Sequence, residues 1–104
     1  MAKITKGIAE KRLADVPEEK RFWCSDGTVW KNLWELEIAL RQMSEETFCH
    51  HSSETKSDFS NWVRDVIGDE KLASDLKRST TLAQAAKSVS NRLAWLKNKM
   101  APDT

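Results

Sequence analysis

Apolar residues recur at helical spacing from about residue 33 to residue 100, and this pattern predicts a series of short helices. The first helix is expected to run from a cap at Asn32 to about Met43. The last is expected to begin at a capping box formed by Thr81 and Gln84 and to end near Met100. The positions that share its apolar face are Leu82, Ala86, Val89, Leu93, Leu96 and Met100.

Shorter helices are expected between these two. Ser44 can cap a helix over residues 45–51, and the polar residues 52–57 that follow are expected to form a loop. Asp58 can cap the next helix, over residues 59–67. These segments are too short to be stable alone, so they must pack on one another.

Gly68 and Asp69 mark the boundary between this helix and the next. Gly68 suits the left-handed cap that ends many helices, and Asp69 can open a further short helix directly after it. Trp62 lies on the apolar stripe of the preceding helix and is therefore expected in the core.

Aromatic and β-branched residues on both sides of an Asp-Gly pair predict a small β-hairpin at about residues 21–30. Asp26 and Gly27 suit a type I′ turn, in which both central residues have positive φ. Trp23 and Trp30 flank this turn, where they either pair across the strands or cover the helices. Because two strands alone are marginally stable, the hairpin must lie against the helices.

The predicted fold class is therefore mainly α, with four to five short helices packed as a small orthogonal bundle and one β-hairpin near the N-terminus. The 104 residues fit a single domain. We expect the helical domain over residues 21–101. Residues 1–20 are charged and weakly periodic, so a flexible or weakly helical arm is expected there.

Composition narrows the function classes. With 39% hydrophobic and 32% charged residues the chain is expected to be globular. A net charge of +1 argues against a protein that mainly coats nucleic acid, although residues 80–104 carry four basic groups and one acidic group. The N-terminus does not resemble a signal peptide, and no apolar run is long enough to span a bilayer. With two cysteines, a soluble cytoplasmic protein without membrane contact is expected.

The middle of the chain carries a series of short motifs in a fixed order, DG…KNL.EL..AL..M…TF..H…DF..WVRDV.GDE.LA. In this it resembles a small prokaryotic domain family of unknown function. The resemblance covers about residues 22–77 and is most specific from Asp58 to Glu70, while Ser57 stands where the family tends to have Asn. Members occur alone and fused to other domains, which implies a binding or regulatory module and supplies no site residues.

Few residues could carry catalytic or metal chemistry. Cys24, Cys49, His50 and His51 are candidate zinc ligands, but adjacent helical residues point about 100° apart and no zinc-binding spacing is present. His51 is instead expected as a half-buried packing or hydrogen-bonding residue, with His50 in solvent. Three glycines leave no phosphate-binding loop, and no motif orients a Cys–His nucleophile pair. We therefore expect no enzyme, no cofactor and no metal.

Two tryptophans do not fit the apolar stripes. Trp34 and Ile38 lie roughly opposite the apolar face of their helix, so either this helix is sandwiched between two layers, with the hairpin as the second, or it presents an apolar patch. Trp95 falls about 140° from the centre of the last helix's apolar arc, near Arg92 and Lys99. It either lies over their stems, is covered by the hairpin or the arm, or anchors an acidic partner.

These residues support two hypotheses. The leading one is a non-catalytic interaction or regulatory module that binds another protein, or itself as a homo-oligomer, through exposed tryptophan. Its candidate partner-binding residues are Trp34, Ile38, Arg92, Trp95 and Lys99. The alternative is a nucleic-acid-binding protein that uses the basic C-terminal helix. The basic residues of that helix are spread around it rather than along one ridge, which makes the alternative weaker.

Overall fold

Six α-helices account for most of the part of the chain that the computed structural model describes, residues 5–53 and 56–100. They are α1 (Lys6–Leu13), α2 (Leu33–Gln42), α3 (Glu45–His51), α4 (Asp58–Trp62), α5 (Glu70–Arg78) and α6 (Leu82–Met100). A short 3-10 turn, η1 (Glu18–Lys20), and a π-helical turn, η2 (Val63–Ile67), complete the helical part. The mainly α class is confirmed, with one more helix than the four to five expected.

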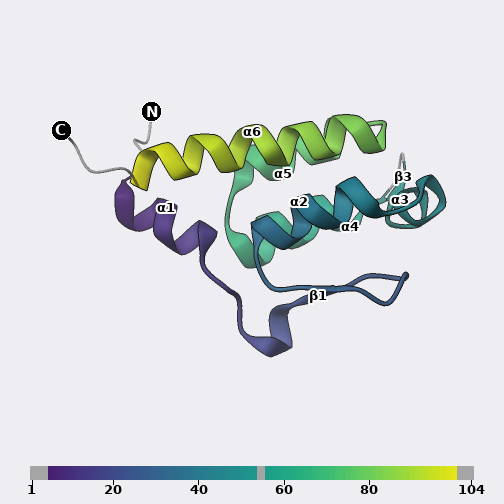
Figure 1. Ribbon diagram of the computed structural model, residues 1–104, viewed down its shortest axis with the longest axis horizontal. Helices are drawn as coiled ribbons and strands as arrows, with labels where there is room; N and C mark the ends of the chain where they lie inside the picture. The colour runs from purple at the N-terminus through teal and green to yellow at the C-terminus, as the bar shows by residue number, and fades with distance from the viewer. Residues whose placement is uncertain (1–4, 54–55, 101–104) are drawn as a thin grey trace.

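The longest helix, α6, organises the arrangement of the others (Figure 1). It packs against α2 and α5 along its length and against α1 near its C-terminal end. In the figure α2 lies between α6 and the hairpin of β1 (Phe22–Trp23) and β2 (Val29–Trp30). The core therefore forms where these layers meet. The residues that α6 buries there are Ala85, Val89, Leu93 and Leu96.

Three helices begin at the caps that the sequence predicts, because each cap is a local contact. The Asn32 Oδ1 accepts a hydrogen bond from the Glu35 amide at 2.9 Å, which starts α2. Ser44 starts α3 and Asp69 starts α5 in the same way, each accepting from the amide three residues ahead. Gly68 takes the left-handed conformation as expected, with φ of 87°.

The capping box before α6 differs from the predicted one in a single contact. Thr81 Oγ1 accepts from the Gln84 amide at 3.1 Å, as expected. The Gln84 side chain, however, accepts from the amide of Thr80 at 2.9 Å. The reciprocal bond is therefore made one residue upstream.

The start of α4 also differs from the prediction. Ser57 is the cap, and its hydroxyl accepts from the Ser60 amide at 3.4 Å. The Asp58 carboxylate instead accepts from His51 Nδ1 at 2.8 Å. After Trp62 the helix widens into η2, which the Gly68 amide closes through a hydrogen bond to the Val63 carbonyl.

The segment 52–57 is not simply a polar loop. β3 (Ser52–Ser53) pairs with β4 (Lys56–Ser57) in an antiparallel ladder. The ladder joins α3 to α4 and places His51 beside Asp58. Residues 54–55, which the loop prediction includes, lie outside the described residues.

The hairpin is present, with Phe22 opposite Trp30 and Trp23 opposite Val29, but its turn is not type I′. Within the described chain no residue other than glycine has positive φ, so Asp26 does not. The Gly27 amide instead bonds to the Cys24 carbonyl, and Gly27 alone is left-handed, with φ of 93°. A type I turn followed by one left-handed residue is the usual geometry of a three-residue hairpin loop.

The hairpin packs on the helices through aromatic rings. Trp30 is buried and stacks on Phe22 with ring centroids 4.4 Å apart, and Phe59 of α4 lies 5.6 Å from both rings. Trp62 is buried edge-on to this stack, as the prediction of a core residue requires, and its Nε1 donates to the Lys20 carbonyl at 2.8 Å. The cross-strand aromatic pair is therefore Phe22 with Trp30, not Trp23 with Trp30.

The N-terminal segment is part of the helical body and not a separate arm. From residue 5 onwards it contains α1, which is capped by Thr5 and buries Ala9 against α6. Val16 donates its amide to the Lys31 carbonyl at 2.7 Å, which fixes the connection to the hairpin. The helix has no clear apolar stripe and only eight residues, so packing rather than local preference stabilises it.

Candidate functional site

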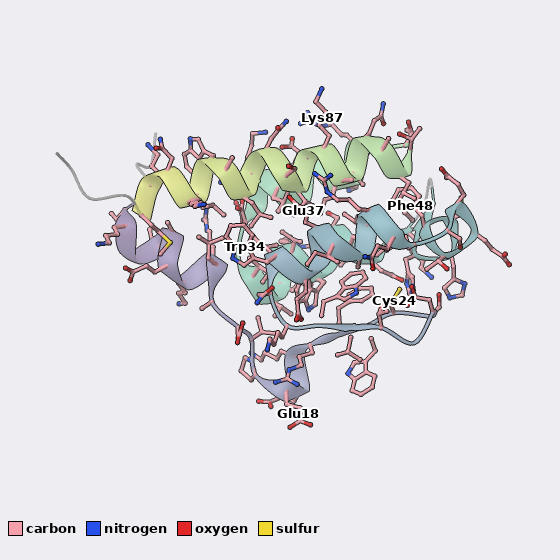
Figure 2. All side chains as sticks on the ribbon, in the orientation of Figure 1. Glu18, Cys24, Trp34, Glu37, Phe48 and Lys87 are labelled. Atoms are coloured by element: carbon pink, nitrogen blue, oxygen red, sulfur yellow. The ribbon has the colours of Figure 1, made fainter. Side chains whose placement is uncertain are left out.

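Trp34 and Ile38 lie on the outer side of α2, one turn apart, with 40% and 53% of their surface exposed. Although α2 lies between α6 and the hairpin, neither covers these two side chains, so α2 presents an apolar patch. Figure 2 labels Trp34 at the point where α2 faces α1 and the C-terminal part of α6. Sequence reasoning singled out both residues.

A groove adjoins Trp34 at this junction of three helices. Its volume is about 480 Å³. Its lining residues are Glu10, Leu13, Ala14, Trp34, Lys97 and Met100. We call this surface the Trp34 groove. Its lining is largely apolar, while Glu10 of α1 and Lys97 of α6 add one charge of each sign.

The sequence did not indicate this groove, because α1 supplies half of its lining. Leu13 and Ala14 belong to the segment that was expected to be an arm. Only the packing of α1 on α6 brings them to Trp34. The one local signal was the pair of apolar residues on the outer side of α2.

Trp95 lies on a different side of α6 and is 36% exposed. The Arg92 guanidinium lies 4.1 Å from the centre of its ring and the Lys99 ammonium 5.1 Å from it. This is the cation–π arrangement that the sequence offered as one alternative. Part of the ring surface is therefore already in contact with the chain's own cations.

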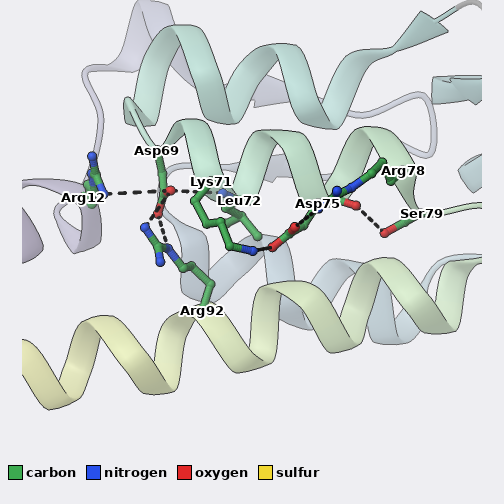
Figure 3. A network of polar contacts seen from close by, with 8 residues as sticks. All are labelled: Arg12, Asp69, Lys71, Leu72, Asp75, Arg78, Ser79 and Arg92. Atoms are coloured by element: carbon green, nitrogen blue, oxygen red, sulfur yellow. Dashed lines mark hydrogen bonds and ion pairs between the residues drawn. The ribbon is translucent and has the colours of Figure 1, made fainter. Parts of the chain in front are cut away.

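Arg92 has a structural partner. Its Nε donates to Asp69 Oδ2 at 2.7 Å and its Nη2 donates to Asp69 Oδ1 at 3.1 Å (Figure 3). Asp69 is fully buried, also caps α5, and lies 3.9 Å from Arg12 Nη1 of α1. Arg92 therefore neutralises a buried carboxylate, and two of its nitrogens already donate within the fold.

The five residues proposed for partner binding consequently do not form one surface. Lys97, which lines the Trp34 groove, and Trp95 are two residues apart on α6, so they point about 160° apart around the helix. Trp95 and Arg92 instead line a separate polar hollow of about 240 Å³ beside Lys71 and Asp75 of α5. Of the five residues, only Trp34 and Ile38 form an apolar site.

Trp23 is the exposed aromatic that sequence reasoning left undecided. It is 71% exposed, because strand residues alternate and its neighbour Phe22 takes the inward position. Val29 faces it across the ladder.

The His51 side chain has a structural role. His51 is buried, and its Nε2 accepts from the Ser25 amide at 3.0 Å while its Nδ1 binds Asp58. An amide can only donate, so Nε2 is the unprotonated nitrogen and Nδ1–H donates to Asp58. Both ring nitrogens are thus satisfied, which agrees with the expected hydrogen-bonding role.

The thiols differ in environment. Cys24 is buried, and this burial raises the pKa of its thiol, which lowers its reactivity, whereas Cys49 is exposed. Over residues 5–53 and 56–100, no group of three or more metal-ligating side chains is close enough to hold an ion. Nor does any helix of that part of the chain have the length and apolar character needed to cross a bilayer.

The Trp34 groove is thus the place where a groove in the surface and an exposed tryptophan occur together. No protein-family profile, no curated protein and no solved structure matches this chain.

Proposed function

We propose that this chain is a non-catalytic interaction module, with a regulatory role, that binds another protein or itself through the Trp34 groove and the adjacent Ile38. The observation that carries the proposal is an exposed tryptophan that lines an apolar groove formed by three helices. Tryptophan is enriched at the energetic centres of protein interfaces, because it supplies a large rigid contact area at low entropic cost.

The surroundings of the groove suit a protein partner. Leu13, Ala14 and Met100 offer apolar contact, and Glu10 and Lys97 add one charge of each sign, so the groove combines apolar and polar contacts as protein interfaces do. A helix or an extended segment with apolar side chains would fill such a groove.

Nucleic-acid binding through α6 is the weaker proposal. Of the four basic residues of this helix, Arg92 is bound to Asp69, and part of the Trp95 ring is in contact with Arg92 and Lys99. Stacking of a base on that face would require these cations to move. Phosphate binding would weaken steeply with salt, whereas binding in the apolar groove would not.

A photo-crosslinking amino acid at position 38 tests the proposed function in a native cell extract. We expect an adduct with one protein, which is lost when Trp34→Ala is added. The matched control places the same crosslinker at Lys77, an exposed position on α5 away from the groove. Equal adducts from positions 38 and 77, or no adduct from position 38, would contradict the proposal.

A further inference from the structure

We propose that α1 docks on the folded domain and leaves it as a unit, and that its docking builds the Trp34 groove. Three of the six lining residues, Glu10, Leu13 and Ala14, belong to α1 or directly follow it, and the other three lie on α2 and α6. When α1 leaves, Trp34 keeps its place on α2 but loses one side of the groove. The coupling of this movement to binding rests on the proposed function, and it names how that site is regulated.

The apolar attachment of α1 is small. Among residues 5–16 only Ala9 is buried. Leu13 and Val16 are half-buried, and Ile8 is exposed. A helix of eight residues has little stability of its own in water, so α1 stays folded only while it is docked. Segments with few buried apolar side chains are the ones that open locally while the rest of a protein stays folded.

The rest of the domain keeps its polar partners when α1 leaves. Arg12 Nη1 lies 3.9 Å from Asp69 Oδ1, which is an ion pair beyond hydrogen-bond distance. The Asp69 carboxylate accepts its hydrogen bonds from Arg92 of α6 and from the Leu72 amide. Departure of α1 therefore leaves this buried carboxylate fully paired, and undocking avoids the cost of an unsatisfied buried charge.

The contacts of the next residues place a hinge directly after α1. Asp15 Oδ1 accepts from Asn32 Nδ2 at 2.7 Å, and Val16 donates its amide to the Lys31 carbonyl at 2.7 Å. These two bonds fix the chain from Asp15 onwards to the start of α2. Ala14, which ends α1, has extended backbone with φ of −72° and ψ of 160°. Rotation about Ala14 can therefore release α1 without disturbing the hairpin or α2.

Docking of α1 and binding in the groove are linked. A partner that contacts Leu13 and Ala14 in the groove binds the docked state better than the undocked one, so it shifts the equilibrium toward docking. Whatever holds α1 in place strengthens binding by the same factor, because coupling between two equilibria is reciprocal. The helix α1 is therefore the element that forms and dismantles the Trp34 groove.

Hydrogen exchange of the full chain, resolved by NMR, tests undocking directly. We expect the amides of residues 10–13 to be protected at least about tenfold less than the hydrogen-bonded amides of α3, because α1 opens without the rest. The helix α3 is a matched internal control, since it has seven residues but buries Phe48 and His51. Amides of α1 that are protected as well as those of α3 would overturn the inference.

Ala9→Asp separates local from global opening. It places a carboxylate at a fully buried position and should release α1, so that residues 10–13 lose their protection while residues 86–93 of α6 keep theirs. The matched control is Ile8→Asp, which introduces the same charge at the adjacent exposed position and should leave protection of α1 unchanged. Loss of protection in α1 and α6 together would show that α1 is an inseparable part of the core, and the inference would be wrong.

The crosslinker at position 38 tests the coupling to binding. The adduct should be lost when Ala9→Asp is added and kept when Ile8→Asp is added. An undiminished adduct with Ala9→Asp would overturn the coupling and leave the proposed function standing. Absence of the adduct without either substitution would contradict the proposed function and its regulation together, whereas the exchange measurement decides the undocking of α1 in either case.

Discussion

Arg92 holds the carboxylate of Asp69 with two parallel hydrogen bonds, of 2.7 and 3.1 Å, across the interface between α6 and the start of α5. The same carboxylate accepts from the Leu72 amide, so it joins the cap of one helix to the side of another. Arg12 brings α1 to the same point, at 3.9 Å. A single buried acid therefore links α1, α5 and α6.

Asp69→Asn tests the charge in this link without removing the cap, because Asn is as good a cap as Asp. We expect a loss of about 3–5 kcal/mol in the free energy of unfolding, since Arg92 would keep a largely buried charge without its counter-ion. Urea denaturation measures the loss. The control is Asp65→Asn in the exposed pair with Arg64, which should leave the free energy of unfolding nearly unchanged. Equal losses in the two variants would show that the buried Asp69–Arg92 pair stabilises the fold no more than an exposed ion pair does.

Trp62→Ala should destabilise the protein by about 3–5 kcal/mol, the usual cost of deleting a buried aromatic side chain. The loss includes the hydrogen bond from Trp62 to the Lys20 carbonyl. Trp23→Ala makes the same chemical change at an exposed position and should cost under about 0.5 kcal/mol. Thermal melting of both variants measures the difference. A Trp62→Ala protein with the melting temperature of wild type would show that Trp62 is not a core residue.

Trp95→Ala should lower the free energy of unfolding by about 1 kcal/mol, because it removes the contacts of the ring with Arg92 and Lys99. It should leave the adduct from position 38 unchanged, whereas Trp34→Ala should abolish this adduct. Crosslinking and thermal melting of the two variants separate these effects. Loss of association in Trp95→Ala would instead favour the hypothesis that Trp95 anchors an acidic partner.

Asp75 gives a pH dependence with a definite sign. Burial alone would raise the pKa of its carboxyl, but hydrogen bonds from Lys71 and Arg78, at 2.6 and 2.7 Å, hold this pKa below its usual value (Figure 3). A carboxyl with a lowered pKa in the folded state stabilises the protein above its unfolded pKa of about 4, and the contribution disappears as the pH falls further. The contribution should be about 0.5–1 kcal/mol at neutral pH, because the partner cations are exposed.

The measurement for Asp75 compares the free energy of unfolding of wild type and Asp75→Asn from neutral pH downwards. The difference should be constant near neutrality and should shrink below about pH 4. High salt should reduce it at neutral pH, since exposed charges are screened. A difference that grows on acidification would have the wrong sign for this assignment.

The amino-acid sequence by itself determined the features that depend on contacts within one turn. Asn32, Ser44 and Asp69 cap their helices by accepting from an amide three residues ahead, and Gly68 ends η2 because its left-handed conformation costs little without a side chain. The position of Trp34 and Ile38 opposite the apolar face of α2 also follows from helical periodicity alone, whereas their exposure does not.

Only the tertiary structure decided which of the remaining side chains are buried and which are free. Whether Trp23 or Trp30 covers the helices depends on which face of the hairpin meets α4, and the use of Arg92 depends on a carboxylate 23 residues away. The helix α1 is too short and too weakly amphipathic to be predicted locally, because its stability comes from α6. The Trp34 groove exists only once that packing has occurred, since residues far apart in the chain build its walls.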